Sequence, residues 1–182
     1  MRQNTQAWTP VTTERLLLRR LEPADRDDAI RIHADPRTNR YNPDDFSAAA
    51  AEATFHMFLD HWNREGFGYW AVAERRKPET VIGFTGLHRG AVDGRDILNL
   101  YYRYDPSVWG HGYATEGAAE SARRGRLHFP ELPVLARTND LNRPSQHTAL
   151  AAGLLRRPEL DRQSGARRHV YFALGWPDGG AG

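Results

Sequence analysis

A short glycine loop is the feature that most constrains the fold of this 182-residue chain. The loop has the sequence Trp109-Gly110-His111-Gly112-Tyr113-Ala114. It follows a strand predicted over residues 97–104 and precedes a helix of small residues predicted to run to Leu127. Successive backbone N–H groups at the start of a helix form an anion site, and glycines let the backbone approach a phosphate closely. The sequence therefore predicts that a phosphorylated compound binds at this loop.

The glycine loop differs from the two common nucleotide-binding loops. Thr115 occupies the position at which the dinucleotide fingerprint G-x-G-x-x-G requires its third small residue. The loop also lacks the Gly-Lys-Ser/Thr sequence of a nucleoside-triphosphate loop. These departures disfavour a module that binds ATP or NAD, which stays open as an alternative at this point.

Composition limits the chemistry further. The chain contains no cysteine, which excludes disulfides, zinc-thiolate sites and an acyl-cysteine intermediate. Lys77 is the single lysine among 25 basic residues, the arginines are scattered and the net charge is only +2, so nucleic-acid binding is not expected. The histidines form no H-x-x-x-H pair, and no metal site is expected. No apolar run approaches the ~20 residues that cross a bilayer, so we expect a cytoplasmic protein without membrane contact.

The length fits one domain, which we expect to span residues 11–174 between mobile tails at residues 1–10 and 175–182. Strands are predicted over residues 11–21, 69–74, 80–87, 97–104, 134–137 and 170–174, with a hairpin turn at Lys77-Pro78. Helices are predicted over residues 24–34, from Ser47 to Gly66, and over residues 113–127 and 142–152. Residues 156–168 are expected to form a polar connection.

Three motifs accompany this order of elements. They are Thr13-Glu14-Arg15-Leu16 in the opening strand, residues 109–116 around the glycine loop, and Asn142-Arg143-Pro144-Ser145 at a helix start. Together they resemble the GNAT superfamily of acyl-CoA-dependent N-acetyltransferases, in particular its ribosomal-protein N-acetyltransferase-like branch, over most of the chain. The resemblance implies an α/β (α+β) fold. Its mixed, mostly antiparallel sheet would have six to seven strands, flanked by helices on both faces and split at the CoA-binding strand.

The resemblance also implies roles for individual residues. The CoA pyrophosphate would be held by the backbone of His111, Gly112, Tyr113 and Ala114, in a loop completed by Trp109, Gly110 and Thr115. The pantetheine arm would pair with backbone amides of the preceding strand, at Tyr102, Arg103 and Tyr104. Asn142 and Ser145 would lie near the pantetheine arm and the thioester. The acceptor cleft would be walled by residues 37–45 and 47–62.

Two positions depart from the family pattern. Asn99 stands where many members carry a glutamate that acts as a base through water, and Ala149 aligns with a tyrosine that protonates the departing thiolate. Ser145 is then the nearest remaining proton donor. We interpret Ser145 and Asn99 as the catalytic positions, with a backbone-bound water in the role of the base.

A site without a strong base favours an amine that is already neutral. A lysine-like amine of pKa ~10.4 gives up roughly 4 kcal/mol to be neutral at pH 7.4, whereas an α-amino group of pKa near 8 gives up about 1 kcal/mol or less. The expected activity is direct transfer of an acetyl group from acetyl-CoA to a primary amine of a peptide, an aminosugar or a small amino compound. The alternative is a GNAT-fold protein that binds acyl-CoA with weak or no transfer. A monomer or a homodimer is expected.

Overall fold

In the computed structural model, residues 8–41 and 46–177 are described. The helices are α1 (Arg26–His33), α2 (Ala48–Glu65), α3 (Tyr113–His128) and α4 (Arg143–Ala151), with short 3-10 helices at Pro23–Asp25, Pro106–Val108 and Pro158–Leu160. The strands are β1 (Val11–Thr12), β2 (Leu16–Arg19), β3 (Tyr69–Glu74), β4 (Lys77–Val92), β5 (Arg95–Tyr104), β6 (Val134–Asn139), β7 (Leu155–Arg156), β8 (Arg162–Ser164) and β9 (Arg167–Leu174).

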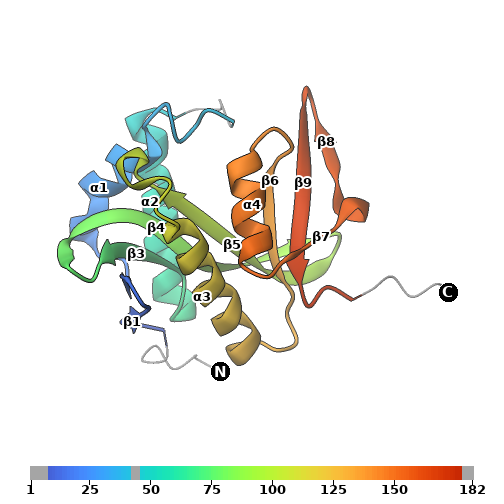
Figure 1. The fold of residues 1–182 in the computed structure, drawn as a ribbon, viewed down its shortest axis with the longest axis horizontal. Coiled ribbons are helices and arrows are strands. Elements are labelled where there is room, and N and C mark those ends of the chain that lie inside the picture. The colour runs from blue at the N-terminus through green and yellow to red at the C-terminus, as the bar shows by residue number, and fades with distance from the viewer. Residues whose placement is uncertain (1–7, 42–45, 178–182) are drawn as a thin grey trace.

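All the strands join one sheet, in the order β1-β2-β3-β4-β5-β6-β9-β7, with β8 also paired to β9 (Figure 1). Among the described residues, only β5 and β6 pair in parallel, and α3 connects them as a crossover helix. The predicted mixed, mostly antiparallel sheet flanked by helices is confirmed. The sheet has nine strands in the described part of the chain instead of six to seven, because β1, β7 and β8 are only two or three residues long and leave little sequence signal.

The parallel junction between β5 and β6 is short. The two strands pair only at Leu98 with Val134 and at Asn99 with Leu135. Beyond Asn99, β5 continues to Tyr104 beside β4, while β6 continues beside β9, and the two halves of the sheet diverge (Figure 1). The predicted split at this strand is confirmed, and among the described residues it leaves one edge of β5 without a partner strand.

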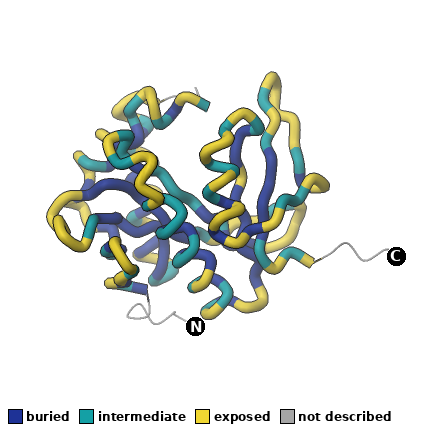
Figure 2. The backbone as a smooth tube through the Cα atoms, viewed as in Figure 1, coloured by how far each residue is buried: buried dark blue, intermediate teal, exposed yellow. Residues whose placement is uncertain are grey.

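Helices cover both faces of the sheet, and Figure 2 shows the buried strands between exposed helix surfaces. The i, i+3, i+4, i+7 spacing of Phe55, Phe58, Leu59 and Trp62 predicts one buried stripe on α2, and all of these residues are buried except Leu59, which is partly buried. The helix runs from the N-cap Ser47 to Gly66, whose φ is 76°. Helix α3 packs on the other face through two glycines, Gly117 and Gly125, which let its backbone approach β4 and β5 closely.

The N-terminal segment differs from its prediction. Trp8, expected in a mobile tail, is fully buried and packs against Phe67 and Trp70 with ring centroids 5.1 and 5.7 Å apart. Residues 11–21 form the hairpin β1–β2 and not one strand, because the Thr13 side chain accepts a hydrogen bond from the Leu16 backbone at 3.1 Å and closes the turn. Residues 1–7 and 178–182 of the expected tails lie outside the described residues.

Two further predictions were wrong. The turn between β3 and β4 lies at Arg75-Arg76, and Lys77 and Pro78 already belong to β4, where a shift of register accommodates them.

The expected polar connection over residues 156–168 contains β7 and β8. Burial opposes ionisation of Asp161, but hydrogen bonds from Arg156 and Arg168 hold its pKa below the usual value and fasten this segment.

In the described part of the chain, no helix is both long and apolar enough to cross a membrane.

Gly117 gives a test of the packing between α3 and the sheet. A Cβ atom there would overlap the Tyr104 hydroxyl and lie 2.9 Å from a methyl carbon of Thr85. We expect Gly117→Ala to lower the free energy of unfolding by about 1–2 kcal/mol, because overpacking exceeds the ~1 kcal/mol gained in helix propensity. Urea denaturation measures the change. The double variant with Tyr104→Phe should recover about half of the loss, and an unchanged loss in that background would contradict the assigned contact.

Candidate active site

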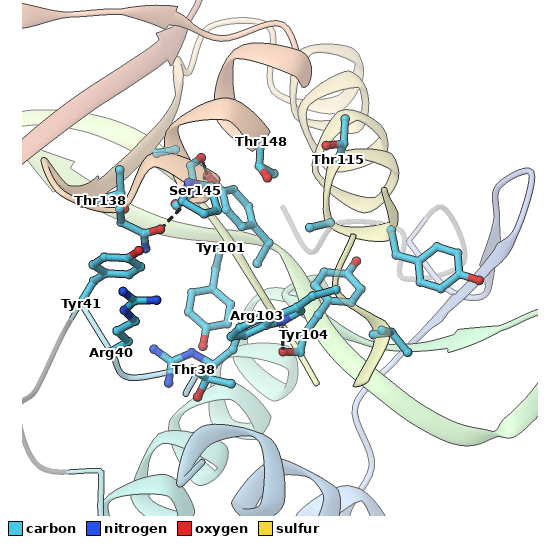
Figure 3. Close-up of a pocket in the computed structure, with 18 of the residues that line it drawn as sticks. Thr38, Arg40, Tyr41, Tyr101, Arg103, Tyr104, Thr115, Thr138, Ser145 and Thr148 are labelled. Carbon is cyan, nitrogen blue, oxygen red and sulfur yellow. Dashed lines mark hydrogen bonds between the residues drawn. The ribbon is translucent and has the colours of Figure 1, made fainter. Parts of the chain in front are cut away.

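A cleft of about 740 Å³ opens where β5 and β6 diverge (Figure 3). One side is formed by the segment that follows α1, through Arg37, Thr38, Arg40 and Tyr41. The other side is formed by the loop before α3, by the first turn of α3 and by α4. Strand β5 lies between the two sides, and residues 100–104 all line the cleft. The described part of the predicted acceptor wall ends at Tyr41, since residues 42–45 lie outside the described residues.

The backbone groups of β5 point alternately to β4 and to the opposite edge of the strand. The backbone N–H of Leu98 donates to Pro133 on the β6 side, whereas that of Asp105 donates to Ile82 beside β4. Because backbone groups alternate along a strand, Tyr102 and Tyr104 direct theirs to the unpaired edge. The backbone groups of Arg103 point to β4, opposite Phe84. The geometry thus differs from the sequence-based expectation for Arg103, whose backbone does not face the cleft.

The side chains of β5 alternate in the same way. Those of Asn99, Tyr101 and Arg103 point to the α1–α2 face: Tyr101 contacts His33 at the end of α1, and Arg103 contacts Asn39 just beyond it. The side chain of Tyr102 points to the opposite face, where α4 lies. One strand therefore presents different side chains to the two sides of the cleft.

The start of α3 is an open anion site. Gly112 is the N-cap, with φ 78° and no side chain to accept hydrogen bonds from the first turn. Gly110 also has a positive φ, of 80°. The first intrahelical bond of this turn runs from the Glu116 N–H to the Gly112 carbonyl, so the preceding N–H groups of Tyr113, Ala114 and Thr115 are directed out of the helix. All of these residues except Glu116 line the cleft, and the arrangement fits a pyrophosphate.

Glu116 fastens this helix start to the β1–β2 turn. Its carboxylate accepts hydrogen bonds from the Thr13 hydroxyl at 2.5 Å, the Arg15 backbone at 2.8 Å and the Arg15 guanidinium at 2.7 Å. Arg15 also donates to the His111 carbonyl at 2.7 Å. Burial opposes ionisation of Glu116, yet these bonds hold its pKa below the usual value. Glu116 therefore positions the loop as a charged brace, and its bound oxygens do not serve as a base.

Two hydroxyl groups meet on the α4 side of the cleft. Tyr102 donates to the Ser145 carbonyl at 2.7 Å, and its oxygen lies 3.2 Å from the Ser145 hydroxyl. Asn142, the N-cap of α4, accepts from the Ser145 N–H at 3.2 Å and so fixes the helix start. Burial raises the pKa of Tyr102 to about 12, although the hydrogen bond to Ser145 opposes the shift. Tyr102 is thus protonated at physiological pH, and its hydroxyl acts as a hydrogen-bond donor.

The structure brings most of the predicted site residues together. Those that line the cleft are Tyr102, Arg103, Tyr104, Trp109, Gly110, Gly112, Tyr113, Ala114, Thr115, Asn142 and Ser145. His111 and Asn99 are not among its lining residues. The His111 ring turns back to the carbonyls of Val108 and Trp109, at 3.1 Å from each. Asn99 donates to the Tyr69 hydroxyl at 2.7 Å behind the cleft.

The described surface of the cleft carries no carboxylate or imidazole. None of its described lining residues is an aspartate, a glutamate or a histidine. His33 lies one layer deeper, where its Nε2 is 2.9 Å from the Tyr101 hydroxyl and its Nδ1 is 2.8 Å from the Ala29 carbonyl. Burial, aided by the charge of Arg103, lowers the pKa of His33 to about 4, so its ring is neutral at physiological pH. The Ala149 side chain is fully buried within the core.

Sequence reasoning missed three side chains of the site. Tyr102 was expected to act through its backbone alone. The role of its hydroxyl depends on the contact with Ser145 of α4, which is a tertiary contact. The Tyr101 ring and the Arg103 guanidinium face the opposite side. The alternation of side chains along a strand is a signal that would have placed Tyr102 on one face and Tyr101 and Arg103 on the other. It does not indicate which residues they contact.

The fold and cleft define a protein with a split sheet, an open anion site at a helix start and a free strand edge beside it. The chain matches the acetyltransferase (GNAT) domain family over residues 15–154. A similar solved structure is an acetyltransferase from Agrobacterium tumefaciens str. C58, with 24% identity, a TM-score of 0.73, and coverage of 91% of this chain and 93% of that chain.

Two further solved structures have similar folds. The ribosomal-protein-S5-alanine acetyltransferase from Vibrio fischeri is 13% identical, with 91% of this chain and 96% of that chain covered and a TM-score of 0.68. RimL, a ribosomal L7/L12 α-N-protein acetyltransferase solved with coenzyme A, is 11% identical, with 90% and 96% covered and a TM-score of 0.71. All three solved structures are less than 25% identical to this chain, so they show that the fold is shared.

The chain belongs to the acetyltransferase (GNAT) family. The family match identifies it as an acyl-CoA-dependent N-acyltransferase. The family match favours acyl-CoA over the ATP or NAD that the glycine loop alone left open.

Proposed function

We propose that the protein transfers the acetyl group of acetyl-CoA directly to a primary amine that reaches the cleft in its neutral form. The observation that carries this proposal is the meeting, in one cleft, of the open α3 start, the free edge of β5 and the hydroxyls of Tyr102 and Ser145. The first suits a pyrophosphate, the second an amide-bearing chain and the third a departing thiolate. The order of these three features along the cleft matches the order of the corresponding groups in acetyl-CoA.

The cofactor-binding roles follow from this placement. The N–H groups of Tyr113, Ala114 and Thr115 would hold the pyrophosphate, in the loop formed by Trp109, Gly110, His111 and Gly112. The backbone of Tyr102 and Tyr104 at the free edge of β5 would pair with pantetheine, and Asn142 would hold the start of α4 against the thioester. Arg103 contributes no backbone group to this edge.

The chemical step is an aminolysis. The amine nitrogen attacks the thioester carbonyl carbon, the C–N bond forms, and collapse of the tetrahedral intermediate breaks the C–S bond. Ser145 or Tyr102 gives a proton to the thiolate and regains one from solvent, and water takes the proton that the attacking nitrogen loses. Alignment of the two reactants and oriented backbone dipoles supply the rest of the acceleration. The absence of cysteine from the sequence agrees with a direct transfer.

The described lining of the cleft offers no base, and this selects the amine. An α-amino group or an aminosugar nitrogen of pKa near 8 is partly neutral at pH 7.4. Deprotonation of a lysine ε-ammonium at that pH costs roughly 4 kcal/mol of free energy. Asn99 stays in the proposal as a residue of the acceptor side that holds Tyr69 in place, and it has no carboxylate with which to accept the proton. Peptide α-amines, aminosugars and small amino compounds are the acceptors that this reasoning supports.

A pH-rate series tests the proposal. With acetyl-CoA saturating, kcat/KM should rise tenfold per pH unit and level off near the pKa of the acceptor itself. Two acceptors with amine pKa values about two units apart should therefore give profiles that break at different pH values. Thiol release measures the rate. A single shared break point would show that an enzyme group controls the proton, and tight CoA binding without thiol release for any amine would support the binding-only alternative.

A further inference from the structure

The described lining of the cleft is rich in arginine. Four arginines line the cleft, Arg37, Arg40, Arg103 and Arg137, and no carboxylate does so within the described residues. Arg37 is neutralised by Asp35, with a nitrogen-to-oxygen distance of 2.6 Å. In the described part of the chain, the other three form no ion pair with a carboxylate. Within the described residues, the positive charge of these three arginines is therefore left unbalanced.

Arg103 is held in a fixed position within this set. Its Nη1 donates to the Asn39 side-chain oxygen at 2.9 Å and to the His33 carbonyl at 3.5 Å. Asn39 is itself buried, and its amide nitrogen donates to the carbonyls of His33 at 2.6 Å and Asp35 at 3.0 Å. The guanidinium is thus pinned at one nitrogen by a buried amide that has little freedom to move.

The other edge of the Arg103 guanidinium is free. Among the described residues, Nε and Nη2 donate no hydrogen bond, although a guanidinium carries five N–H donors in a planar fork. Such an edge matches the two oxygens of a carboxylate or a phosphate. A surface arginine can satisfy these donors with water while its side chain stays mobile. The Arg103 side chain is already immobilised by a buried asparagine, so binding an anion costs it little further conformational entropy.

The position of Arg103 indicates which ligand it faces. The pyrophosphate site lies at the start of α3, whereas the Arg103 side chain points to the α1–α2 face with Tyr101. In Figure 3, Thr38, Arg40 and Arg103 lie together on one side of the cleft, away from Thr148 and Thr115. Arg40, whose guanidinium carbon is 5.4 Å from the centre of the Tyr41 ring, lies on the same wall. The unbalanced charge is therefore on the side where the acceptor enters.

We propose that the acceptor amine carries an anionic group, a carboxylate or a phosphate, which binds the free edge of Arg103 with Arg40 beside it. This inference rests on the proposed function, since it concerns the acceptor of the same transfer. The anion orients the acceptor so that its amine points across β5 towards the thioester. Arg103 acts here as a specificity residue and takes no part in proton transfer.

Two matched pairs of acceptors test this inference. Ala-Ala and Ala-Ala amide have similar α-amines and differ in the C-terminal carboxylate, and phosphoethanolamine and ethanolamine differ in the phosphate. We expect kcat/KM to be at least tenfold higher for the anionic member of one pair, which corresponds to 1.4 kcal/mol. The pair that shows the larger ratio identifies the anion. Rates are compared at equal fractions of neutral amine, so that amine pKa does not enter the ratio.

Arg103→Gln should reduce the anionic-to-neutral ratio at least tenfold. The matched control is Arg76→Gln, which removes the same charge from the exposed β3–β4 turn and should leave the ratio unchanged. Thiol release from neutral and anionic acceptors at equal rates, or a ratio that Arg103→Gln does not alter, would overturn the inference and leave the proposed function standing.

Absence of thiol release from every amine would instead contradict the proposed function. The same pairs are then compared by calorimetric titration of the protein with CoA bound. Preferential binding of an anionic member, lost in Arg103→Gln, supports the inference without any turnover, and equal binding of both members overturns it.

Discussion

The Gly112→Val variant is expected to bind CoA at least tenfold more weakly than the unmodified protein, a loss of 1.4 kcal/mol or more. Gly112 adopts φ 78° and ψ 5°, a left-handed conformation that costs a residue with a Cβ atom roughly 1–2 kcal/mol and a β-branched residue more. Relief of that strain rotates the peptide that precedes Tyr113, and the N–H groups of the first turn of α3 lose their common direction. Calorimetric titration with CoA measures the effect.

A second glycine provides the control for that experiment. Gly153 has φ 90° at the end of α4, and no heavy atom lies within 4 Å of the position its Cβ would occupy. Gly153→Val therefore introduces similar backbone strain outside the cleft lining and should leave CoA affinity within about twofold, well under 1 kcal/mol. Equal affinities for a folded Gly112→Val variant and for Gly153→Val would remove the glycine loop from the CoA site.

Removal of both hydroxyls on the α4 side should lower kcat about 100-fold. Each of Tyr102→Phe and Ser145→Ala alone is expected to cost about tenfold, because the two oxygens are 3.2 Å apart and the remaining hydroxyl can still reach the thiolate. The double variant leaves water as the only donor. The effect is smaller than for a poor leaving group, since a thiol of pKa near 8.5 departs readily as its anion.

Steady-state kinetics with acetyl-CoA separate this role from a structural one. The loss should appear in kcat, with the KM for the acceptor nearly unchanged, and Ser145→Thr, which keeps a hydroxyl, should retain most of the rate. The pKa of Tyr102, about 12, predicts that the wild-type kcat does not fall between pH 8 and 10 through loss of this proton. An unchanged kcat in the double variant would show that solvent, and not these hydroxyls, protonates the departing thiolate.

The sequence predicts the elements that rest on strong local signals. The stripe of Phe55, Phe58 and Trp62 and the terminal pair Ser47 and Gly66 define α2 almost to the residue. The hairpin between β4 and β5 was missed, although Asp93-Gly94 is a typical two-residue turn sequence and both residues have positive φ. Its flanking residues are exposed and lack the alternation of apolar side chains on which the strand prediction relied.

The site is predictable to a lesser extent. The glycine loop is recognisable because its function depends on backbone geometry, which glycine encodes locally. The roles of the Tyr102 hydroxyl and the Arg103 guanidinium depend on Ser145 and Asn39, which are 43 and 64 positions away along the chain. No local pattern records such a partner. The same limit applies to Trp8, which was assigned to a tail because its neighbours are polar and which packs against distant aromatic rings.

The alternation along β5 has a consequence for how this enzyme can change. In the proposed arrangement, the two substrates bind at interleaved positions of one strand, with the even-numbered residues facing acetyl-CoA and the odd-numbered side chains facing the acceptor. Point substitutions at Tyr101 or Arg103 can therefore retune acceptor choice while the machinery for acetyl-CoA stays intact. Insertion or deletion of one residue between Asn99 and Tyr104 would instead exchange the two sets and disable both halves of the reaction at once. Acceptor specificity can therefore change through substitutions in this strand, but not through changes in its length.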